Sequence, residues 1–153
     1  MSGQSQVETP LRIDVRNVRV NQALSQETSC FSATLYVDGR RVGTAGNRGE
    51  GGCNEYDVAR DILEKMEKSA REWCAGNVDW WKPEYLEALD AMIGELIDRK
   101  EEEKFVRRRA GSQTLFRLKG DAKGVWRAVS GPRGPQVEAW IRERYGDQIE
   151  RIV

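Results

Sequence analysis

Histidine is absent from this chain of 153 residues. A Ser–His–Asp triad, a Cys–His pair and a metal site with histidine ligands all require an imidazole ring. None of these three kinds of site can be built from this chain alone. The sequence therefore favours a binding function, and we expect no enzyme activity, no cofactor and no bound metal.

Cysteine is scarce, and its spacing excludes the common zinc motifs. Cys30, Cys53 and Cys74 are 23 and 21 residues apart, and no two of them form a Cys-x-x-Cys pair. Three cysteines fit a reducing compartment better than a disulfide framework. Cys30 and Cys74 lie in apolar patterns and are expected to be buried, whereas Cys53 lies in a glycine-rich loop and is expected to be exposed.

Long apolar runs are also missing. No run approaches the roughly 20 residues that cross a bilayer, and residues 1–5 have no basic region followed by an apolar one. We therefore expect a cytoplasmic protein that does not contact a membrane. The 25 basic and 25 acidic side chains balance, so the net charge is zero.

Alternating apolar and polar residues mark three strands in the first third of the chain. After a predicted flexible tail, residues 1–10, this period of two runs through residues 11–16 and continues to Val20 across a bulge near Asn17. It returns in residues 31–37 and 41–45, joined by Asp38-Gly39, a strong hairpin signal. We expect a three-stranded antiparallel meander.

Two helices are expected in the middle of the chain. Residues 46–54 form a glycine-rich loop, and Asn54 is placed to cap a first helix that ends near Gly76. Pro83 suits the first turn of a second helix that ends at Gly111. About 27 residues give that helix a length of about 40 Å, so we expect its far end to project or to meet a partner, including a second copy in a homodimer.

One stretch of the chain resembles a known family. The strand, Asp-Gly turn, strand, glycines and helix between Phe31 and Met66 resemble the C-terminal half of double-stranded RNA-binding domains. That family has lysines at the start of this helix, which bind phosphate. Here the corresponding residues 54–57 are Asn, Glu, Tyr and Asp, so the resemblance implies shared geometry and no RNA-binding site.

The patterns in the last third of the chain predict further strands and a third helix. Residues 114–118 and 125–129 read as a hairpin around a turn, Val137 to Tyr145 as a helix, and residues 149–153 as a closing strand. We predict an α+β fold in which an antiparallel sheet, a meander plus a C-terminal hairpin, packs against two central helices and one C-terminal helix. Residues 11–153 are expected to form one domain, with sub-lobes 11–111 and 112–153 as the alternative.

The balanced charge hides a division along the chain. Residues 57–104 carry 8 basic and 14 acidic side chains, a net charge of −6, whereas residues 105–153 carry 11 and 5, a net charge of +6. These segments provide either two binding surfaces of opposite sign or two surfaces that face each other within the domain.

Two adjacent tryptophans, Trp80 and Trp81, lie in the loop between the predicted central helices. Both rings do not easily enter one core, and exposed tryptophan is enriched at interface hot spots. We expect one ring to cover the helices and the other to anchor a protein partner. Glu101, Glu102 and Glu103, in the charged part of the second helix, extend this predicted partner-binding surface.

Basic residues of the last third are the candidates for nucleic-acid binding. Phe116 and Trp126 interleave with them, as stacking residues would. The alternative is that both rings are core and that the cations end a helix or pair with acidic side chains. The candidate residues are Arg107, Arg108, Arg109, Arg117, Lys119, Lys123, Arg127 and Arg133.

Two further patterns carry weaker signals. The loop of residues 46–54 precedes a helix, as phosphate-binding loops do, but it lacks a Gly-Lys-Ser/Thr ending and carries acidic neighbours. A two-metal cluster would have to be assembled from Asp14, Asp38, Glu64 and Asp121, of which two are better explained as turn residues.

Taken together, these features predict a non-catalytic interaction protein that docks on another macromolecule. An accessory protein of a mobile element, such as an inhibitor that docks on a host protein complex, is compatible with this prediction. The alternative is a nucleic-acid-binding protein that uses the basic C-terminal lobe.

Overall fold

The computed structural model describes residues 10–84 and 86–153. The predicted flexible tail therefore lies outside the described residues, apart from Pro10. The chain divides into two compact units, Met1–Ile97 (unit 1) and Asp98–Val153 (unit 2). In order, the elements are β1 (Ile13–Asn21), η1 (Gln22–Leu24), β2 (Cys30–Val37), β3 (Arg40–Arg48), β4 (Glu55–Val58), α1 (Arg60–Asn77), α2 (Ala88–Arg109), β5 (Gln113–Leu118), β6 (Arg127–Ser130), α3 (Pro135–Tyr145), η2 (Gly146–Gln148) and β7 (Ile149–Ile152).

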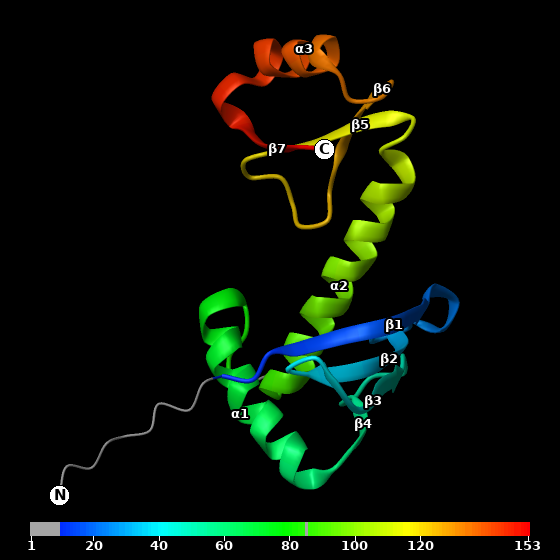
Figure 1. Cartoon of the computed structure of the whole chain (residues 1–153), viewed down its shortest axis with the longest axis vertical. Helices are drawn as coiled ribbons and strands as arrows, with labels where there is room; N and C mark the ends of the chain where they lie inside the picture. The colour runs from blue at the N-terminus through cyan, green and yellow to red at the C-terminus, as the bar shows by residue number, and fades with distance from the viewer. Residues whose placement is uncertain (1–9, 85) are drawn as a thin grey trace, which may run out of the picture. The chain divides into compact units, whose positions relative to one another are not determined.

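Unit 1 contains an antiparallel sheet with the strand order β1-β2-β3-β4 (Figure 1). The predicted bulge is confirmed, because the register of β1 shifts between Arg16 and Arg19 and Asn17 has a φ of 52°. The predicted hairpin is also confirmed. Asp38 and Gly39 have φ values of 51° and 82°, as a tight two-residue turn requires.

The predicted start of the first helix was wrong. Residues 55–58 form a fourth strand, β4, and α1 begins at Arg60. Glu55 and Asp57 are exposed while Tyr56 and Val58 are half-buried, which is the alternation of an edge strand. The meander is therefore four-stranded. The resemblance to double-stranded RNA-binding domains ends here, because a strand occupies the position of their helix start.

The predicted start of the second helix was also wrong. The helix α2 begins at Ala88 rather than at Pro83, and its 22 residues span about 33 Å. Its first turn is capped from another helix, because the Glu67 carboxylate accepts hydrogen bonds from the backbone N–H groups of Ala88 and Leu89 at 3.0 and 2.9 Å. Such a cap depends on tertiary packing, so no local sequence signal reports it.

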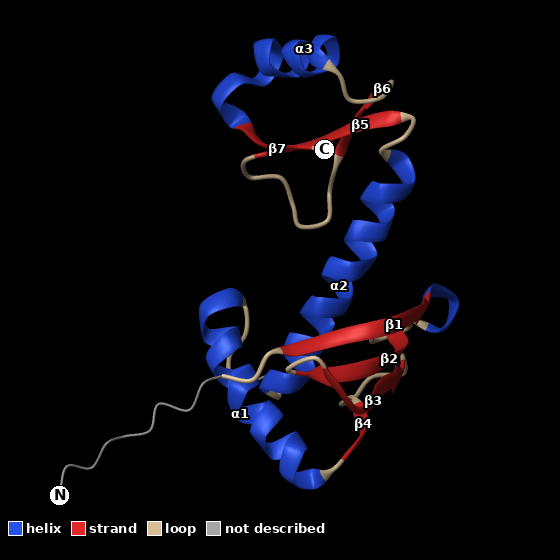
Figure 2. Cartoon of the chain, in the orientation of Figure 1, coloured by secondary structure: helices blue, strands red, loops and turns tan. Residues whose placement is uncertain are grey.

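The core of unit 1 lies between the sheet and two helical segments (Figure 2). One face of the sheet contributes Val15, Leu35 and Ala45, and α1 contributes Met66, Ala70 and Cys74. The first six residues of α2, 88–93, are all buried. The opposite face of the sheet carries polar side chains. Within α2, the buried hydrophobic residues are Ala88, Leu89, Ala91, Met92, Ile93 and Ile97.

Unit 2 combines the end of α2 with a three-stranded antiparallel sheet, order β6-β5-β7, and α3. The predicted hairpin, third helix and closing strand are all present. Phe116 and Leu118 from the central strand pack with Ile141 of α3, and the Phe116 and Tyr145 ring centroids are 5.2 Å apart.

The predicted α+β class with antiparallel sheets is confirmed. The boundary between the units lies inside α2, before the alternative boundary at residue 111. The unfolding of residues 11–153 as one domain stays a prediction. No helix of the described chain combines the length and the apolarity needed to cross a membrane.

Candidate binding surfaces

In the turn after α1, Trp81 is fixed by hydrogen bonds whereas the side chain of Trp80 is exposed. Val78 donates its N–H to the carbonyl of Cys74 at 2.9 Å, and Trp81 donates its N–H to the carbonyl of Val78 at 3.2 Å. The indole N–H of Trp81 donates to the carbonyl of Leu86 at 2.8 Å. These bonds fix the chain on both sides of Trp80, whose side chain is 56% exposed.

The two rings therefore have different surroundings. Trp81 is half-buried and packs against the core of unit 1. Trp80 is exposed at the tip of a hydrogen-bonded turn, so its contact area is presented on a defined backbone. Trp81 has the placement expected of the covering ring, and the role of Trp80 as an anchor for a protein partner stays a prediction.

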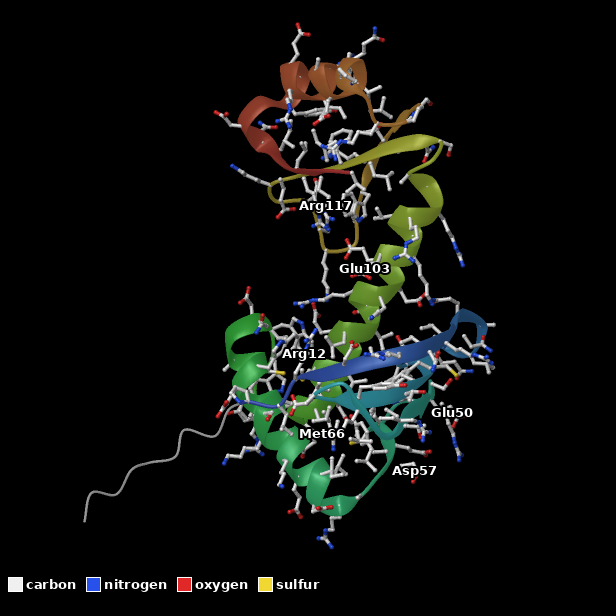
Figure 3. All side chains as sticks on the ribbon, viewed as in Figure 1. Arg12, Glu50, Asp57, Met66, Glu103 and Arg117 are labelled. Atoms are coloured by element: carbon white, nitrogen blue, oxygen red, sulfur yellow. The ribbon has the colours of Figure 1, made fainter. Side chains whose placement is uncertain are left out.

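The three consecutive glutamates of α2 do not share one environment. Glu102 accepts hydrogen bonds from the indole N–H of Trp126 at 2.8 Å and from Arg117 at 3.3 Å, so it is engaged inside unit 2. Glu101 forms an ion pair within its own helix. Glu103 is exposed (Figure 3). Trp80 and Trp81 belong to unit 1 and these glutamates to unit 2, so each group of predicted partner-binding residues is described within its own unit.

Arg117 is occupied by contacts within unit 2. Its side chain is only 15% exposed and pairs with Glu102 at 3.3 Å and Glu150 at 3.1 Å. It also donates to the carbonyls of Asp121 and Ala122. Its guanidinium therefore has little free surface for a phosphate group.

Arg127 is also paired within unit 2. It binds both carboxylate oxygens of Asp121, at 3.1 and 3.0 Å. The hydrogen bonds from Arg127 and from the N–H of Leu118 lower the pKa of Asp121 to about 2. In turn, the hydrogen bond to Asp121 raises the pKa of Arg127.

Two further cations of the predicted set have acidic partners. Arg133 donates to Glu138 at 3.1 Å and to the carbonyl of Ile152. Its hydrogen bond, with that of Arg142, lowers the pKa of Glu138. Lys123 lies 3.7 Å from a carboxylate oxygen of Asp98. Four of the eight predicted nucleic-acid contacts are therefore engaged by acidic side chains.

The other four cations are exposed. Arg107, Arg108 and Arg109 end α2, and Lys119 follows β5. Within the part of the chain that the structure describes, none of the four forms an ion pair. The guanidinium of Arg109 lies 4.5 Å from the ring centroid of Phe105.

One of these four cations, Arg107, lines a groove of about 780 Å³ in unit 2. Trp126 is part of its wall, but the edge of the ring is bound to Glu102, and the guanidinium groups of Arg117 and Arg151 lie 5.5 and 5.8 Å from its centroid. The predicted stacking role of Trp126 is thus not favoured by its surroundings. The groove is lined by Arg99, Glu102, Glu103, Val106, Arg107, Ala110, Arg117, Trp126, Glu150, Arg151 and Val153.

The glycine-rich loop is anchored by a chain of polar side chains that the sequence did not reveal. Thr28 donates to Asn47 at 2.7 Å, Asn47 to Asn54 at 3.1 Å, and Asn54 to the hydroxyl of Tyr56 at 3.2 Å. The Tyr56 hydroxyl donates to buried Asp90. Burial, together with the hydrogen bond to Asp90, raises the pKa of Tyr56. These bonds give the loop a structural role within unit 1.

The four carboxylates of the alternative metal cluster have separate local roles. Asp14 pairs with Arg16, and Asp38 accepts the N–H of Arg12 at 2.9 Å. Glu64 forms an ion pair within α1, and Asp121 belongs to unit 2. Over residues 10–84 and 86–153, no three His, Cys, Asp or Glu side chains are grouped to hold a metal ion.

Comparison with known protein families, curated proteins and solved structures found no match to this chain.

Proposed function

We propose that this protein is a non-catalytic docking protein that binds another protein through Trp80. The observation that carries the proposal is the contrast between the two adjacent rings. Trp81 is tied into unit 1 by its indole N–H, while Trp80 is 56% exposed on the same turn. An inhibitor carried by a mobile element and directed at a host protein complex is one role that such docking serves.

A partner that covers Trp80 removes the exposed apolar area of its ring from water. A tryptophan side chain buries roughly 150–250 Å² when fully enclosed. Covering the 56% of Trp80 that is exposed therefore contributes about 2–3.5 kcal/mol at about 25 cal/mol per Å². That is the size of an interface hot spot. The fixed backbone on either side reduces the ordering cost of binding.

The chain offers a matched control for this proposal. Trp140 of α3 is 47% exposed and is expected to lie outside the docking surface. Affinity capture followed by mass spectrometry identifies candidate partners, and calorimetry with a purified partner then compares Trp80→Ala with Trp140→Ala. We expect the first change to weaken binding by about 30-fold or more and the second by less than about threefold. Equal effects of the two changes would contradict the proposal.

A second candidate function rests on the four exposed cations Arg107, Arg108, Arg109 and Lys119. Within the described chain they have no acidic partner, so they are available to phosphate groups. Binding of a labelled 20-base-pair DNA duplex would be followed by fluorescence anisotropy over a salt series. Replacing the three arginines with glutamine is expected to reduce the slope of log K against log salt by about 2–3.

Arg127→Gln is the control for that experiment, because its guanidinium is already bound to Asp121. We expect this variant to retain nearly the full slope. Absence of binding at low salt would exclude the nucleic-acid function, since phosphate contacts are strongest there.

A further inference from the structure

We propose that the open face of the sheet β1–β4 is a self-complementary surface for a second copy of this chain. The two copies are related by a twofold axis parallel to the strands. This surface is distinct from Trp80 and from the basic residues of unit 2, and the inference does not depend on the function proposed above. It follows from the register of the strands.

Side chains on the open face form two rows across the four strands. Each row begins with an arginine on β1, passes through small residues on β2 and β3, and ends with an acidic residue on β4. The first row is Arg19, Ser32, Gly46 and Glu55, and the second is Arg16, Thr34, Thr44 and Asp57. One edge of the face is therefore basic and the opposite edge acidic.

The small central residues leave a shallow hollow of about 760 Å³ over this face. Ser32, Thr34, Thr44 and Gly46 line it, together with the charged residues Arg19, Glu55 and Asp57 from the two outer strands. Two sheets pack about 10 Å apart when their facing side chains are of ordinary size. Short hydroxyl side chains therefore allow a second sheet to approach while the longer charged residues meet at the edges.

Only some of the charged side chains in the two rows have an ion-pair partner within the described chain. Among the described residues, Arg19 and Asp57 have no ion-pair partner. Arg16 is paired with Asp14 at 3.5 Å and lies over the Tyr36 ring. The contact of Glu55 with Arg48 is long, at 3.9 Å. Arg19 and Asp57 are thus the charges with the most to gain from an external partner.

A second copy of the chain can place opposite charges against both the basic and the acidic edge, and the direction of the twofold axis decides whether it does. A twofold axis parallel to the strands places β1 of one copy opposite β4 of the second copy, and it keeps each row opposite itself. Arg19 then faces Glu55 of the second copy, Arg16 faces Asp57 of the second copy, and both contacts occur twice. A twofold axis perpendicular to the strands would instead place arginine against arginine. The parallel axis is therefore the complementary one.

A third row agrees with this arrangement. Asp14, Tyr36 and Arg41 are aligned on β1, β2 and β3. The same axis places β2 opposite β3, so Tyr36, whose ring is already covered by Arg16, and Arg41 of the second copy lie in facing positions without a clash of like charges. Asp14 is already paired with Arg16.

The area of the face predicts a weak association. Four strands about 4.8 Å apart and about six residues of 3.3 Å each give a face of roughly 400 Å² per copy. The total of roughly 800 Å² is below the roughly 1,200–2,000 Å² of stable specific interfaces and belongs with weak, transient contacts. The association is therefore measured by sedimentation velocity up to roughly hundreds of micromolar protein, at low salt and with a reductant present.

Charge reversal provides a decisive test. Arg16→Glu with Arg19→Glu makes both edges acidic, and Glu55→Lys with Asp57→Lys makes both edges basic. Each double variant alone is expected to associate at least tenfold more weakly than the native chain. An equimolar mixture of the two is expected to associate at least as strongly as the native chain, because every facing pair is again of opposite sign.

Controls separate this surface from others. Arg60→Glu with Lys65→Glu, at exposed positions of α1, changes the net charge by the same amount as Arg16→Glu with Arg19→Glu. This control variant is expected to associate as strongly as the native chain. Circular dichroism checks folding, and the single changes Arg19→Glu and Glu55→Lys replace any double variant that fails to fold. The proposal is overturned if the native chain stays monomeric. It is also overturned if each double variant associates as strongly as the native chain, which is the result expected of a dimer formed through α2. A mixture of the two double variants that associates no better than either variant alone would overturn it too.

Discussion

Two carboxylates, Glu67 and Asp121, fix backbone segments in their respective units. Glu67 accepts two N–H groups at the start of α2, and Asp121 accepts the N–H of Leu118 together with the guanidinium of Arg127. Hydrogen bonds to a charged partner are stronger than neutral ones. Both residues therefore lead to predictions about stability.

The ionised form of Asp121 is favoured in the folded chain, because its pKa falls from an ordinary 3.8 to about 2. A group with a lowered pKa stabilises the fold above its unfolded pKa, and this contribution is lost as the pH falls toward the folded pKa. We expect the difference in free energy of unfolding between the native chain and Asp121→Asn to be constant above about pH 5. It should shrink between about pH 4 and pH 2.

Urea unfolding at a series of pH values measures that difference, and NMR of the carboxyl carbon measures the pKa itself. Arg127→Gln removes the leading cause of the shift, so it should raise the pKa of Asp121 toward its ordinary value. A pH-independent difference would contradict the assignment.

Glu67→Ala removes the cap of α2 and leaves the N–H groups of Ala88 and Leu89 without their acceptor. Ala88 and Leu89 are buried, so water replaces the carboxylate poorly. We expect the free energy of unfolding to fall by about 1.5–3 kcal/mol, measured in urea at pH 7. Glu67→Gln keeps one acceptor oxygen and should cost less, whereas equal costs would argue that the charge is the main contribution.

At the scale of elements, the strands with strict alternation and the Asp38-Gly39 hairpin were predictable from the sequence, because the period of two and the turn residues are local signals. The identity of β4 was not. Asn54 is a residue type that often caps helices, but its side chain accepts a hydrogen bond from Asn47 and donates one to the hydroxyl of Tyr56, and its backbone N–H donates to Asp90. The tertiary hydrogen bonds of Asn54 therefore outweigh its local tendency to cap a helix, and the sequence does not display these bonds.

The pairing of β4 with β3 depends on one glycine. Gly43 has a φ of 153°, and a Cβ there would overlap the carbonyl oxygen of Asp57. Gly43→Ala is therefore expected to force β4 away from the sheet and to cost at least about 2 kcal/mol.

Gly94, inside α2, is the matched control, because an added Cβ there has nothing within 4 Å. Gly94→Ala is expected to stabilise the chain by about 0.5–1 kcal/mol. Thermal unfolding measures both variants. A harmless Gly43→Ala would mean that β3 and β4 are not held in this close register.

At the scale of the whole molecule, the division of charge along the chain was predictable from the sequence, but the ion pairs that the charged residues form were not. The positions of Arg117 and Arg127 gave no sign that Glu102 and Asp121 would engage them, because those partners are 15 and 6 residues away along the chain. The contrast between Trp80 and Trp81 was predictable, since two adjacent bulky rings rarely share one core.

Unit 2 contains 56 residues, and its buried hydrophobic residues are Leu115, Phe116, Leu118 and Ile141. A unit of this size is marginal by itself, and α2 contributes to both units. We therefore expect the units to unfold together. Ile141→Ala should destabilise the chain by about 2–4 kcal/mol, and hydrogen exchange should accelerate in peptides from α1 as well as in those from β5. Acceleration confined to unit 2 would show that the units unfold independently.

The three cysteines differ in how readily they react. Cys74 is buried, donates to the carbonyl of Ala88, and has a pKa raised by burial to about 11, whereas Cys53 is exposed. A maleimide dye added near neutral pH should therefore attach first at Cys53, ahead of half-buried Cys30 and of buried Cys74. The same thiol can be oxidised by air to link two molecules covalently, and such a product would imitate a reversible dimer in any preparation that is not kept reduced.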